Sequence, residues 1–226
     1  MKQKPLALFA AAVAAFALPA LAGEEDAKPI FDGKSFEGWE GDTEKTWRIE
    51  DGALVAGSLD KKQERNDFLA TKKEYEDFEL FIEWKLEGTE GFVNGGVQFR
   101  TKRIPNHHEV SGYQADLGKG WDGALYDESR RNKVLARPTE EVAAKAVKPG
   151  EWNQYRILCE GPRIQLWLNG VQTVDYTEED PGIDRKGIIA VQIHGGAKSI
   201  VRYKNIKIRE IQKKDASGEK GADEEK

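Results

Sequence analysis

Short runs in which apolar and polar residues alternate occur along most of the chain. Between residues 78 and 86, for example, Phe78, Leu80 and Ile82 alternate with polar or opposite-facing neighbours. A period of two predicts a strand with one face in a core. The pairs Asp51-Gly52 and Asn169-Gly170 are strong signals for two-residue hairpin turns. The predicted strands are 47–50, 53–56, 67–71, 78–86, 94–101, 109–116, 152–160, 163–169, 171–176, 187–194 and 200–209.

Helical periodicity is nearly absent, and only 138–147 is predicted as a short helix. Many strands with almost no helix exclude folds in which strands and helices alternate. The chain has no internal repeat, which argues against a propeller. The pattern therefore predicts an all-β, two-sheet jelly-roll β-sandwich, with a closed up-and-down barrel as the alternative.

The two ends of the chain differ from this strand-rich region. Lys2 and Lys4 precede an apolar run that ends in a small-residue pattern at 20–22. This arrangement predicts a signal peptide over 1–22 and a secreted or periplasmic protein, and the alternative is an uncleaved membrane anchor. Residues 213–226 are charged or small, which predicts a disordered tail. One domain of about 29–212 remains between them.

Charge and cysteine content narrow the function. The chain has 35 basic and 40 acidic side chains, a formal net charge of −5. An acidic chain without a basic stripe argues against nucleic acid as a partner, and we expect no membrane association after signal cleavage. Cys159 is the sole cysteine, so no internal disulfide can form, and its place in an apolar strand predicts a buried, inert thiol.

Three predicted strands carry polar side chains on the face turned away from the core. Glu109, Ser111 and Tyr113 are expected on the opposite face of their strand. The residues expected on the polar face are Gln98, Arg100, Gln114, Asp116, Gln192 and His194. Lys and Glu usually cover a merely solvated sheet, whereas amides, imidazole and guanidinium donate and accept hydrogen bonds in fixed directions. This composition favours a hydroxyl-rich ligand.

The loop over 118–131 adds aromatic and charged residues, namely Trp121, Tyr126, Glu128 and Arg130. Aromatic rings that stack on a sugar ring, next to hydrogen-bonding groups, are typical of carbohydrate sites. Structural roles remain open for several of these residues. His194 could accept a backbone hydrogen bond, Arg100 could form an ion pair with Asp116, and the loop aromatics could fill the end of the sandwich.

An ordered series of motifs resembles the 3-keto-disaccharide hydrolase domain family. The segment FDGKSFEGW at 31–39 resembles the family's FDGKSLxGW opening, and the resemblance extends over about residues 29–210. Further matching segments are IEDGAL (49–54), NGGVQFR (94–100), GYQAD (112–116), GALYD (123–127), GIIAVQIHGG (187–196) and YKNI (203–206). The resemblance implies a concanavalin A-like jelly roll, export, and cleavage of glycosides whose C3 hydroxyl has been oxidised to a ketone.

The implied chemistry begins with the C2 proton, which the C3 ketone acidifies. It requires a base, a stabiliser for the enolate oxygen and a proton donor for the leaving group. Our hypothesis places Arg100 and Gln114 at the ketone oxygen, His194 or Asp116 as the base, and Glu128 or Tyr126 at the leaving group. The catalytic residues would be His194, Asp116 and Glu128. Sugar contacts are expected from Gln98, Arg100, Gln114, Trp121, Tyr126, Arg130 and Gln192.

A divalent cation is an alternative to Arg100, with Asp116, Glu128 and His194 as ligands. No spacing in the chain demands a metal. The run His107-His108-Glu109 is a tempting metal motif, but adjacent residues of a strand face opposite ways, so we expect a loop without a metal there.

Two other functions are compatible with the same polar face. A two-carboxylate glycosidase would follow an oxocarbenium path, but none of the predicted strands carries the E-x-D-x-E pattern common to such enzymes of this fold class. A non-catalytic, lectin-like carbohydrate-binding module would need the polar face but no base. Separate substitutions of His194 and Asp116 would distinguish it, since a binding module loses affinity where an enzyme loses turnover.

Overall fold

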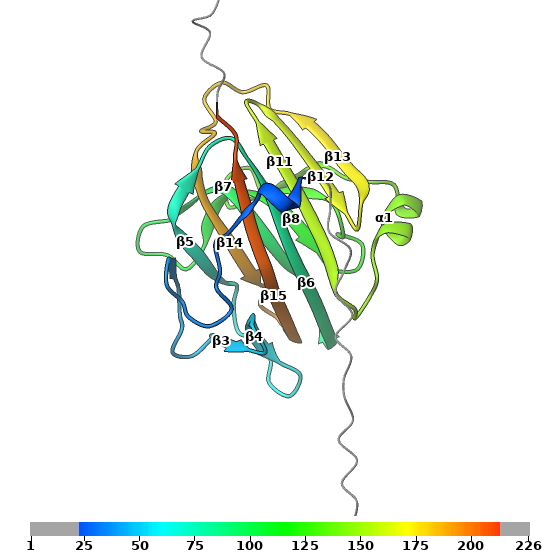
Figure 1. The fold of residues 1–226 in the computed structure, drawn as a ribbon. Coiled ribbons are helices and arrows are strands. Elements are labelled where there is room, and N and C mark those ends of the chain that lie inside the picture. Colours follow the sequence, from blue (N-terminus) through cyan, green and yellow to red (C-terminus); the bar gives the residue numbers. More distant parts are fainter. Residues whose placement is uncertain (1–22, 213–226) are drawn as a thin grey trace, which may run out of the picture.

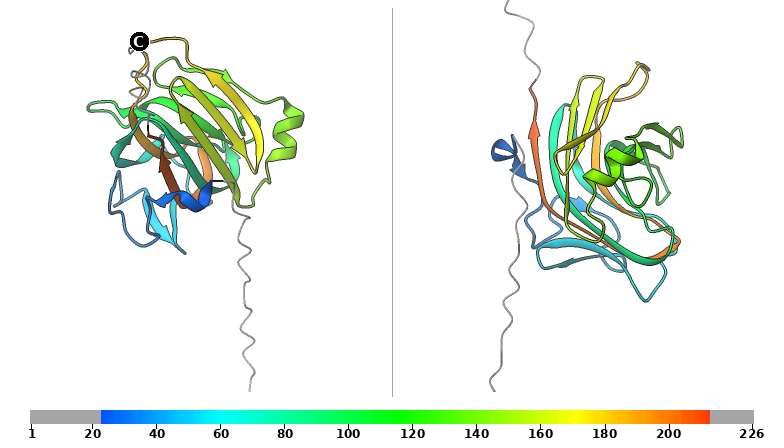
Figure 2. Two further views of the ribbon diagram at one scale, coloured as in Figure 1. Left: turned by 45° about the horizontal axis from the view of Figure 1, so that its top comes forward. Right: turned by 90° about the vertical axis from the view of Figure 1, so that its right-hand side faces the viewer.

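The alternating segments pair into two antiparallel sheets that pack face to face (Figure 1). The structure is a computed structural model that describes residues 23–212. The predicted signal peptide (1–22) and the predicted tail (213–226) lie outside the described residues. An edge-on view shows the two layers, and the two-sheet sandwich predicted from the sequence is confirmed (Figure 2).

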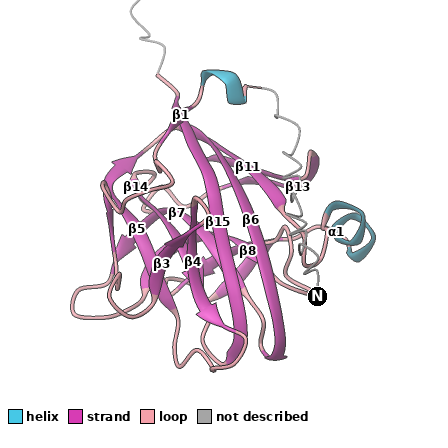
Figure 3. Ribbon diagram, turned by 60° about the horizontal axis from the view of Figure 1, so that its bottom comes forward, coloured by secondary structure: helices cyan, strands magenta, loops and turns pink. Residues whose placement is uncertain are grey.

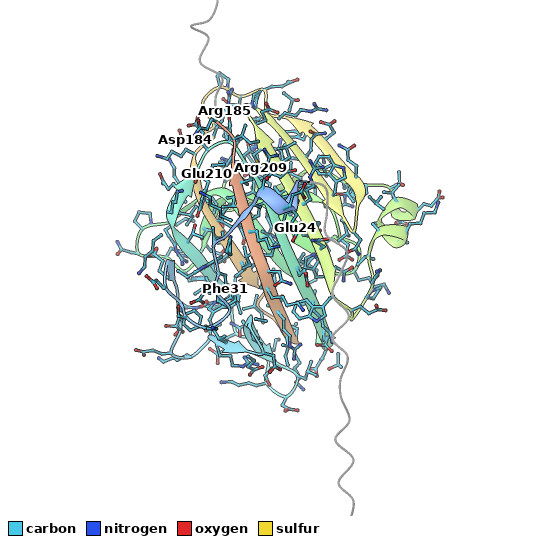
Figure 4. All side chains as sticks on the ribbon, in the orientation of Figure 1. Glu24, Phe31, Asp184, Arg185, Arg209 and Glu210 are labelled. Atoms are coloured by element: carbon cyan, nitrogen blue, oxygen red, sulfur yellow. The ribbon has the colours of Figure 1, made fainter. Side chains whose placement is uncertain are left out.

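The first sheet, here called sheet A, is built around two long neighbouring strands, β6 and β15. Its strand order is β13 (Val171–Thr177), β12 (Arg163–Leu168), β11 (Asn153–Glu160), β6 (Phe78–Gly91), β15 (Ala197–Glu210), β4 (Ala53–Ser58) and β3 (Trp47–Glu50). The short β1 (Lys28–Pro29) pairs with the other end of β15. The 3-10 helix η1 (Glu24–Asp26) lies over β15, where Glu24 accepts hydrogen bonds from Lys207 and Gln154 (Figure 4).

The second sheet, sheet B, lies behind sheet A in Figure 1. Its strand order is β10 (Lys133–Ala136), β9 (Leu125–Glu128), β8 (Val110–Leu117), β7 (Gly95–Arg103), β14 (Gly187–Ile193), β5 (Asp67–Tyr75) and β2 (Trp39–Glu40). Strands distant in sequence, such as β7 and β14, are therefore direct neighbours.

The core fills the space between the sheets. Leu80 and Ile82 of β6 are fully buried there, as are Val97 and Phe99 of β7. Cys159 of β11 belongs to the same cluster, and burial raises the pKa of its thiol to about 12. The predicted buried position of this cysteine is confirmed, and its thiol stays protonated at neutral pH.

Each predicted strand is present, and the predicted helix contains α1 (Glu140–Ala146), capped by the Thr139 hydroxyl. The sequence pattern missed β1, β2, β9 and β10 because two to four residues are too few to show an alternation. The two helical segments lie at the periphery of the strands (Figure 3). Within residues 23–212, no helix combines the length and apolar character needed to cross a bilayer.

Candidate functional site

The register of sheet B brings the predicted polar residues side by side. Gln98 of β7 pairs with Gln114 of β8, and Asp116 pairs with Gly96. On the other side of β7, Gly96 pairs with Gln192 of β14. These side chains lie on the outer face of sheet B, because Val97, Ala115 and Val191, which alternate with them, belong to the core.

Two amide side chains link into a hydrogen-bonded series that ends on a carboxyl group. Gln98 donates to Gln114, and Gln114 Nε2 donates to Asp116 Oδ1 at 2.6 Å. Gly96 makes room for this series, since a Cβ there would lie 2.4 Å from Gln114 Cδ. Asp116 is only 2% exposed, so its carboxyl group is fixed in position and largely removed from water.

A contact across the sheet shows that this outer face is concave. Glu128 of β9 lies three strands from Gln192, a separation of about 14 Å in a flat sheet. Nevertheless Glu128 Oε2 accepts a hydrogen bond of 3.4 Å from Gln192 Nε2. The two side chains meet because the sheet curves, and the residues of this face therefore converge on a common centre.

Both carboxyl groups of this face hold their protons more strongly than usual. Burial raises the pKa of Asp116 to about 8, and the neighbouring charge of Glu128 adds to this effect. Burial also raises the pKa of Glu128 to about 7, assisted by the charge of Glu109. At neutral pH most Asp116 side chains are protonated, while Glu128 lies near its midpoint. Such values suit proton transfer.

His194 directly follows β14, whose Gln192 belongs to this face, and it is half-buried. Its Nδ1 lies 2.6 Å from the carbonyl oxygen of Gly195. A carbonyl can only accept, so Nδ1 carries the proton in this contact and Nε2 of the neutral ring has a free lone pair. His194 therefore donates to the backbone instead of accepting from it as expected, and its other nitrogen is left available as a base.

Aromatic rings form a rim along one side of the face. The Phe92 ring lies 4.8 Å from that of His194 and 6.2 Å from that of Trp121, and Trp121 lies 6.0 Å from Tyr126. Phe92 is 44% exposed, unusual for so large an apolar side chain. The sequence analysis missed Phe92 because a single aromatic residue in a turn region gives no periodic signal.

Several buried oxygens on this face have no hydrogen-bond partner in the described part of the chain. They are Gln98 Oε1, Gln192 Oε1, Asp116 Oδ2 and Glu109 Oε2. Buried polar atoms are normally paired. A cluster of unpaired acceptors next to an aromatic rim is therefore suited to a ligand that supplies O–H or N–H donors.

The expectation that Arg100 shares this face is wrong. A β-bulge between Phe99 and Lys102 interrupts the pairing of β7 with β8, and Arg100 adopts a positive φ of 47°. Its side chain is directed to the turns of sheet A, where it donates to Asp77 Oδ1 and the carbonyls of Glu76 and Gly161, each at 2.8 Å. Arg100 is a structural ion-pair partner of Asp77, not of Asp116.

Arg130 is also misplaced in the sequence-based prediction. Its Nε donates to Asp127 Oδ1 at 2.9 Å, and its guanidinium lies over the Tyr113 ring. Asp127 and Tyr113 are buried on the inner side of sheet B. Because Asp127 alternates with the outer-facing Tyr126 and Glu128, Arg130 lies on the side opposite the site.

Glu109 also departs from the simple alternation, but unlike Arg100 and Arg130 it lies near the site instead of away from it. It was expected opposite to Asp116, but its charge acts on Glu128, and Asn66 donates to its Oε1 at 3.1 Å. Glu109 precedes β8, at the end of the β7–β8 loop, where strand alternation no longer applies.

No group of three His, Cys, Asp or Glu side chains within residues 23–212 has the arrangement of a metal site. This includes Asp116, Glu128 and His194, the set considered for a divalent cation. The His107–Glu109 run likewise lacks such an arrangement, and its two imidazole rings stack at 4.4 Å.

Comparison with known proteins places this geometry in context. Residues 26–209 match the family described as the 3-keto-alpha-glucoside-1,2-lyase-like domain. A 3-keto-disaccharide hydrolase of Bacteroides thetaiotaomicron is 25% identical over 169 residues, which are 65% of this chain and 57% of that protein. The match thus spans little more than half the length of this curated relative.

Solved structures share the fold. A Parabacteroides distasonis protein provisionally described as a glycosyl hydrolase aligns with a TM-score of 0.63 and 22% identity, over 86% of this chain and 99% of that one. The carbohydrate-binding module CBM66 of Bacillus subtilis aligns with a TM-score of 0.58 and 15% identity, over 76% and 94% of the respective chains. These similarities confirm the predicted lectin-like, concanavalin A-type sandwich.

Proposed function

Because the chain belongs to the 3-keto-alpha-glucoside-1,2-lyase-like domain family, we propose that it binds a 3-keto-glycoside on the concave face of sheet B and cleaves the glycosidic bond by elimination. Its relatives are carbohydrate-active proteins named as hydrolases and lyases. The observation that carries the proposal is the pair of carboxyl groups, Asp116 and Glu128, whose pKa values lie near 8 and 7 beside an aromatic rim.

The first step removes the proton from C2 of the sugar. His194 Nε2 accepts this proton, and the C–H electron pair moves toward the C3 carbonyl, placing negative charge on its oxygen. Asp116 takes the role first given to Arg100. A carboxylic acid held neutral by burial can donate a hydrogen bond to a developing oxyanion. Gln114 fixes Asp116 Oδ1, so Oδ2 is the oxygen that carries the proton.

The second step breaks the bond between C1 and the glycosidic oxygen. The enolate electrons form a C1–C2 double bond and restore the ketone, while Glu128 gives its proton to the departing oxygen. Tyr126 is a weaker donor for this step, because burial raises the pKa of its hydroxyl. Water then adds to C1 and a proton returns to C2, so the net reaction is the addition of one water molecule.

Sugar binding would use the groups that have no hydrogen-bond partner among residues 23–212. Phe92 and Trp121 offer faces for the apolar side of a sugar ring. The amide oxygens of Gln98 and Gln192 are unpaired acceptors for its hydroxyl groups. The ligand would thus supply the donors that the site lacks.

The direct test measures nitrophenol release from 4-nitrophenyl 3-keto-α-D-glucopyranoside by the purified protein, with and without a chelator. We expect release above the buffer rate, and a loss of about 100-fold or more in His194→Ala, the usual size of a general-base effect. The comparison with chelator shows whether a metal ion takes part. Release no faster than buffer in both conditions would refute the proposal for this substrate class.

A non-catalytic carbohydrate-binding role is the second candidate. The aromatic rim and the unpaired acceptors support it, since neither feature requires a base. Measuring sugar affinity and turnover separately in His194→Ala and Asp116→Asn distinguishes the two. An enzyme keeps most of its affinity in these variants and loses turnover, whereas a binding module has no turnover to lose.

Export to the periplasm or the exterior is also proposed, from the predicted signal peptide over 1–22. Expression of the full chain in a bacterial host, followed by cell fractionation and N-terminal sequencing, tests it. We expect a mature protein that begins at Gly23 outside the cytoplasm. Retention of residues 1–22 on a cytoplasmic product would contradict the proposal.

A further inference from the structure

The end of the β7–β8 hairpin, residues 103–109, folds back across the outer face of sheet B. Arg103 Nη2 donates to the carbonyl oxygens of Glu40 and Phe68, at 2.9 and 3.1 Å, on strands beyond β14. At the other side of the hairpin end, Asn66 Nδ2 donates to Glu109 Oε1 at 3.1 Å. These contacts hold the hairpin end against β5 and place Glu109 over the sheet.

The two carboxylate oxygens of Glu109 have different surroundings. Oε1 is held by Asn66 and lies 3.3 Å from His108 Nε2. Oε2 is buried and has no hydrogen-bond partner within residues 23–212. The carboxylate is thus anchored through one oxygen, and the other is buried without a partner of its own among the described residues.

The anchor also connects Glu109 to His194, the proposed base. Asn66 Oδ1 accepts a hydrogen bond of 2.9 Å from the backbone N–H of Gly195. The carbonyl of the same Gly195 contacts the imidazole of His194. Asn66 therefore bridges Glu109 and the turn that presents His194, which fixes the carboxylate beside the site.

The charge of Glu109 acts on Glu128, which indicates that the Glu109 carboxylate faces the candidate site. Among the neighbouring charges that raise the pKa of Glu128, that of Glu109 acts most strongly, ahead of Asp127 in the adjacent position of the same strand. Apart from the protonated Asp116 Oδ2, the unpaired buried oxygens on this face, one of them from Glu109, are acceptors. A ligand that fits must therefore offer donors, and added negative charge would be repelled.

We infer that Glu109 is a specificity-determining residue, whose Oε2 accepts a hydrogen bond from a hydroxyl group of the bound sugar and whose charge rejects sugars that carry a carboxylate. The inference rests on the proposed function only in that the face binds a sugar, and it holds for an enzyme and for a binding module alike. It identifies the preferred ligand as a neutral glycoside rather than a uronic acid derivative.

Two stable probes test this assignment without turnover. Methyl α-D-glucopyranoside lacks the C3 ketone and cannot be eliminated, and methyl α-D-glucopyranosiduronic acid adds one carboxylate. NMR titration gives the affinity of each for the wild type, Glu109→Gln, Glu109→Ala and the control Glu160→Gln, which removes the same charge at the exposed end of β11.

We expect the wild type to prefer the neutral glucoside. Glu109→Ala should weaken its binding at least about tenfold, the scale of a hydrogen bond to a charged group. Glu109→Gln should reduce the ratio of the affinity for the neutral glucoside to that for the uronic acid by a similar factor. Its unfolding midpoint should equal that of the wild type. Deoxy analogues of the glucoside, each lacking one hydroxyl group, distinguish a direct contact from a structural role. The analogue that lacks the hydroxyl group bound by Glu109 should bind the wild type and Glu109→Ala equally well.

The inference fails if both Glu109 variants match Glu160→Gln in affinity and selectivity while the wild type binds the glucoside. That result would leave the proposed function intact. A wild type that binds neither methyl glycosides nor a 3-keto-glucoside would instead overturn both.

Discussion

At the scale of single residues, Asp116 shows how strongly the site departs from an ordinary protein surface. Its carboxyl group is 2% exposed, and its hydrogen bonds come from the neutral amide side chains of Gln114 and Asn94. Burial without a cationic partner disfavours the ionised form and raises the pKa of Asp116 to about 8. The folded protein tolerates this poorly solvated acid where a neutral amide would fit equally well, which is typical of functional positions.

Asp116→Asn should therefore stabilise the protein, increasingly so as pH rises. The folded-state pKa of Asp116 lies above its unfolded value, so the folded protein binds more protons between about pH 4 and pH 8 and its stability falls through that range. Asparagine removes this dependence. In urea denaturation, the free energy of unfolding of Asp116→Asn relative to the wild type should be higher at pH 8.5 than at pH 5 by about 2 kcal/mol or more. Equal differences at both pH values would show that Asp116 ionises freely in the folded state.

The pH dependence of turnover follows from Glu128. If Glu128 must be protonated to assist the leaving group, kcat/KM should fall as pH rises past the Glu128 pKa of about 7. Initial rates across pH 5–9 measure this limb of the profile. Substituting Glu109 by glutamine removes a like charge, so the same limb should move to lower pH. A profile that rises through pH 7 to 8 would instead assign Glu128 as a base.

At the scale of elements, the β-bulge in β7 decides which residues reach the site. Val97 and Phe99 follow the alternation, but the positive φ at Arg100 directs the guanidinium to the turns of sheet A. There Arg100 and Asp77 form an ion pair, with the Arg100 side chain 1% exposed. The bulge thus replaces an expected site residue by a tie between the two sheets.

Arg100→Ala should destabilise the fold by about 3–5 kcal/mol, because it leaves the buried Asp77 carboxylate without its cationic partner. Arg48→Ala is a suitable control, since the Arg48–Glu50 pair is largely exposed and should contribute less than about 1 kcal/mol. Denaturant unfolding of both variants provides the comparison. Similar losses in the two would show that the Arg100–Asp77 pair does not hold the sheets together.

At the scale of the whole molecule, the sequence predicts well what depends on regular alternation. The strands, the sandwich and the shared outer face of Gln98, Gln114, Asp116 and Gln192 all follow from period-two patterns. The alternation is interrupted at the β-bulge of β7 and stops where each strand ends. The predictions failed for residues at these positions. Arg100, Arg130 and Glu109 all lie at such positions, and Phe92 joins the rim from a turn.

The curvature of sheet B, which brings Glu128 into contact with Gln192, cannot be predicted from any local sequence pattern either. It arises from the twist and packing of seven strands drawn from distant parts of the chain. The sequence could therefore identify most members of the site, but not the distances between them or the raised pKa values that result.

Deuterium incorporation at C2 of the sugar shows whether the glycosidic bond is cleaved by elimination. Cleavage of 4-nitrophenyl 3-keto-α-D-glucopyranoside in D₂O, followed by NMR at early times, reports whether the C2 proton leaves during the reaction. The account predicts a 3-keto-glucose product deuterated at C2 well above a no-enzyme control, with both release and labelling lost in His194→Ala. Release of nitrophenol with the original C2 proton retained would contradict an elimination at this face.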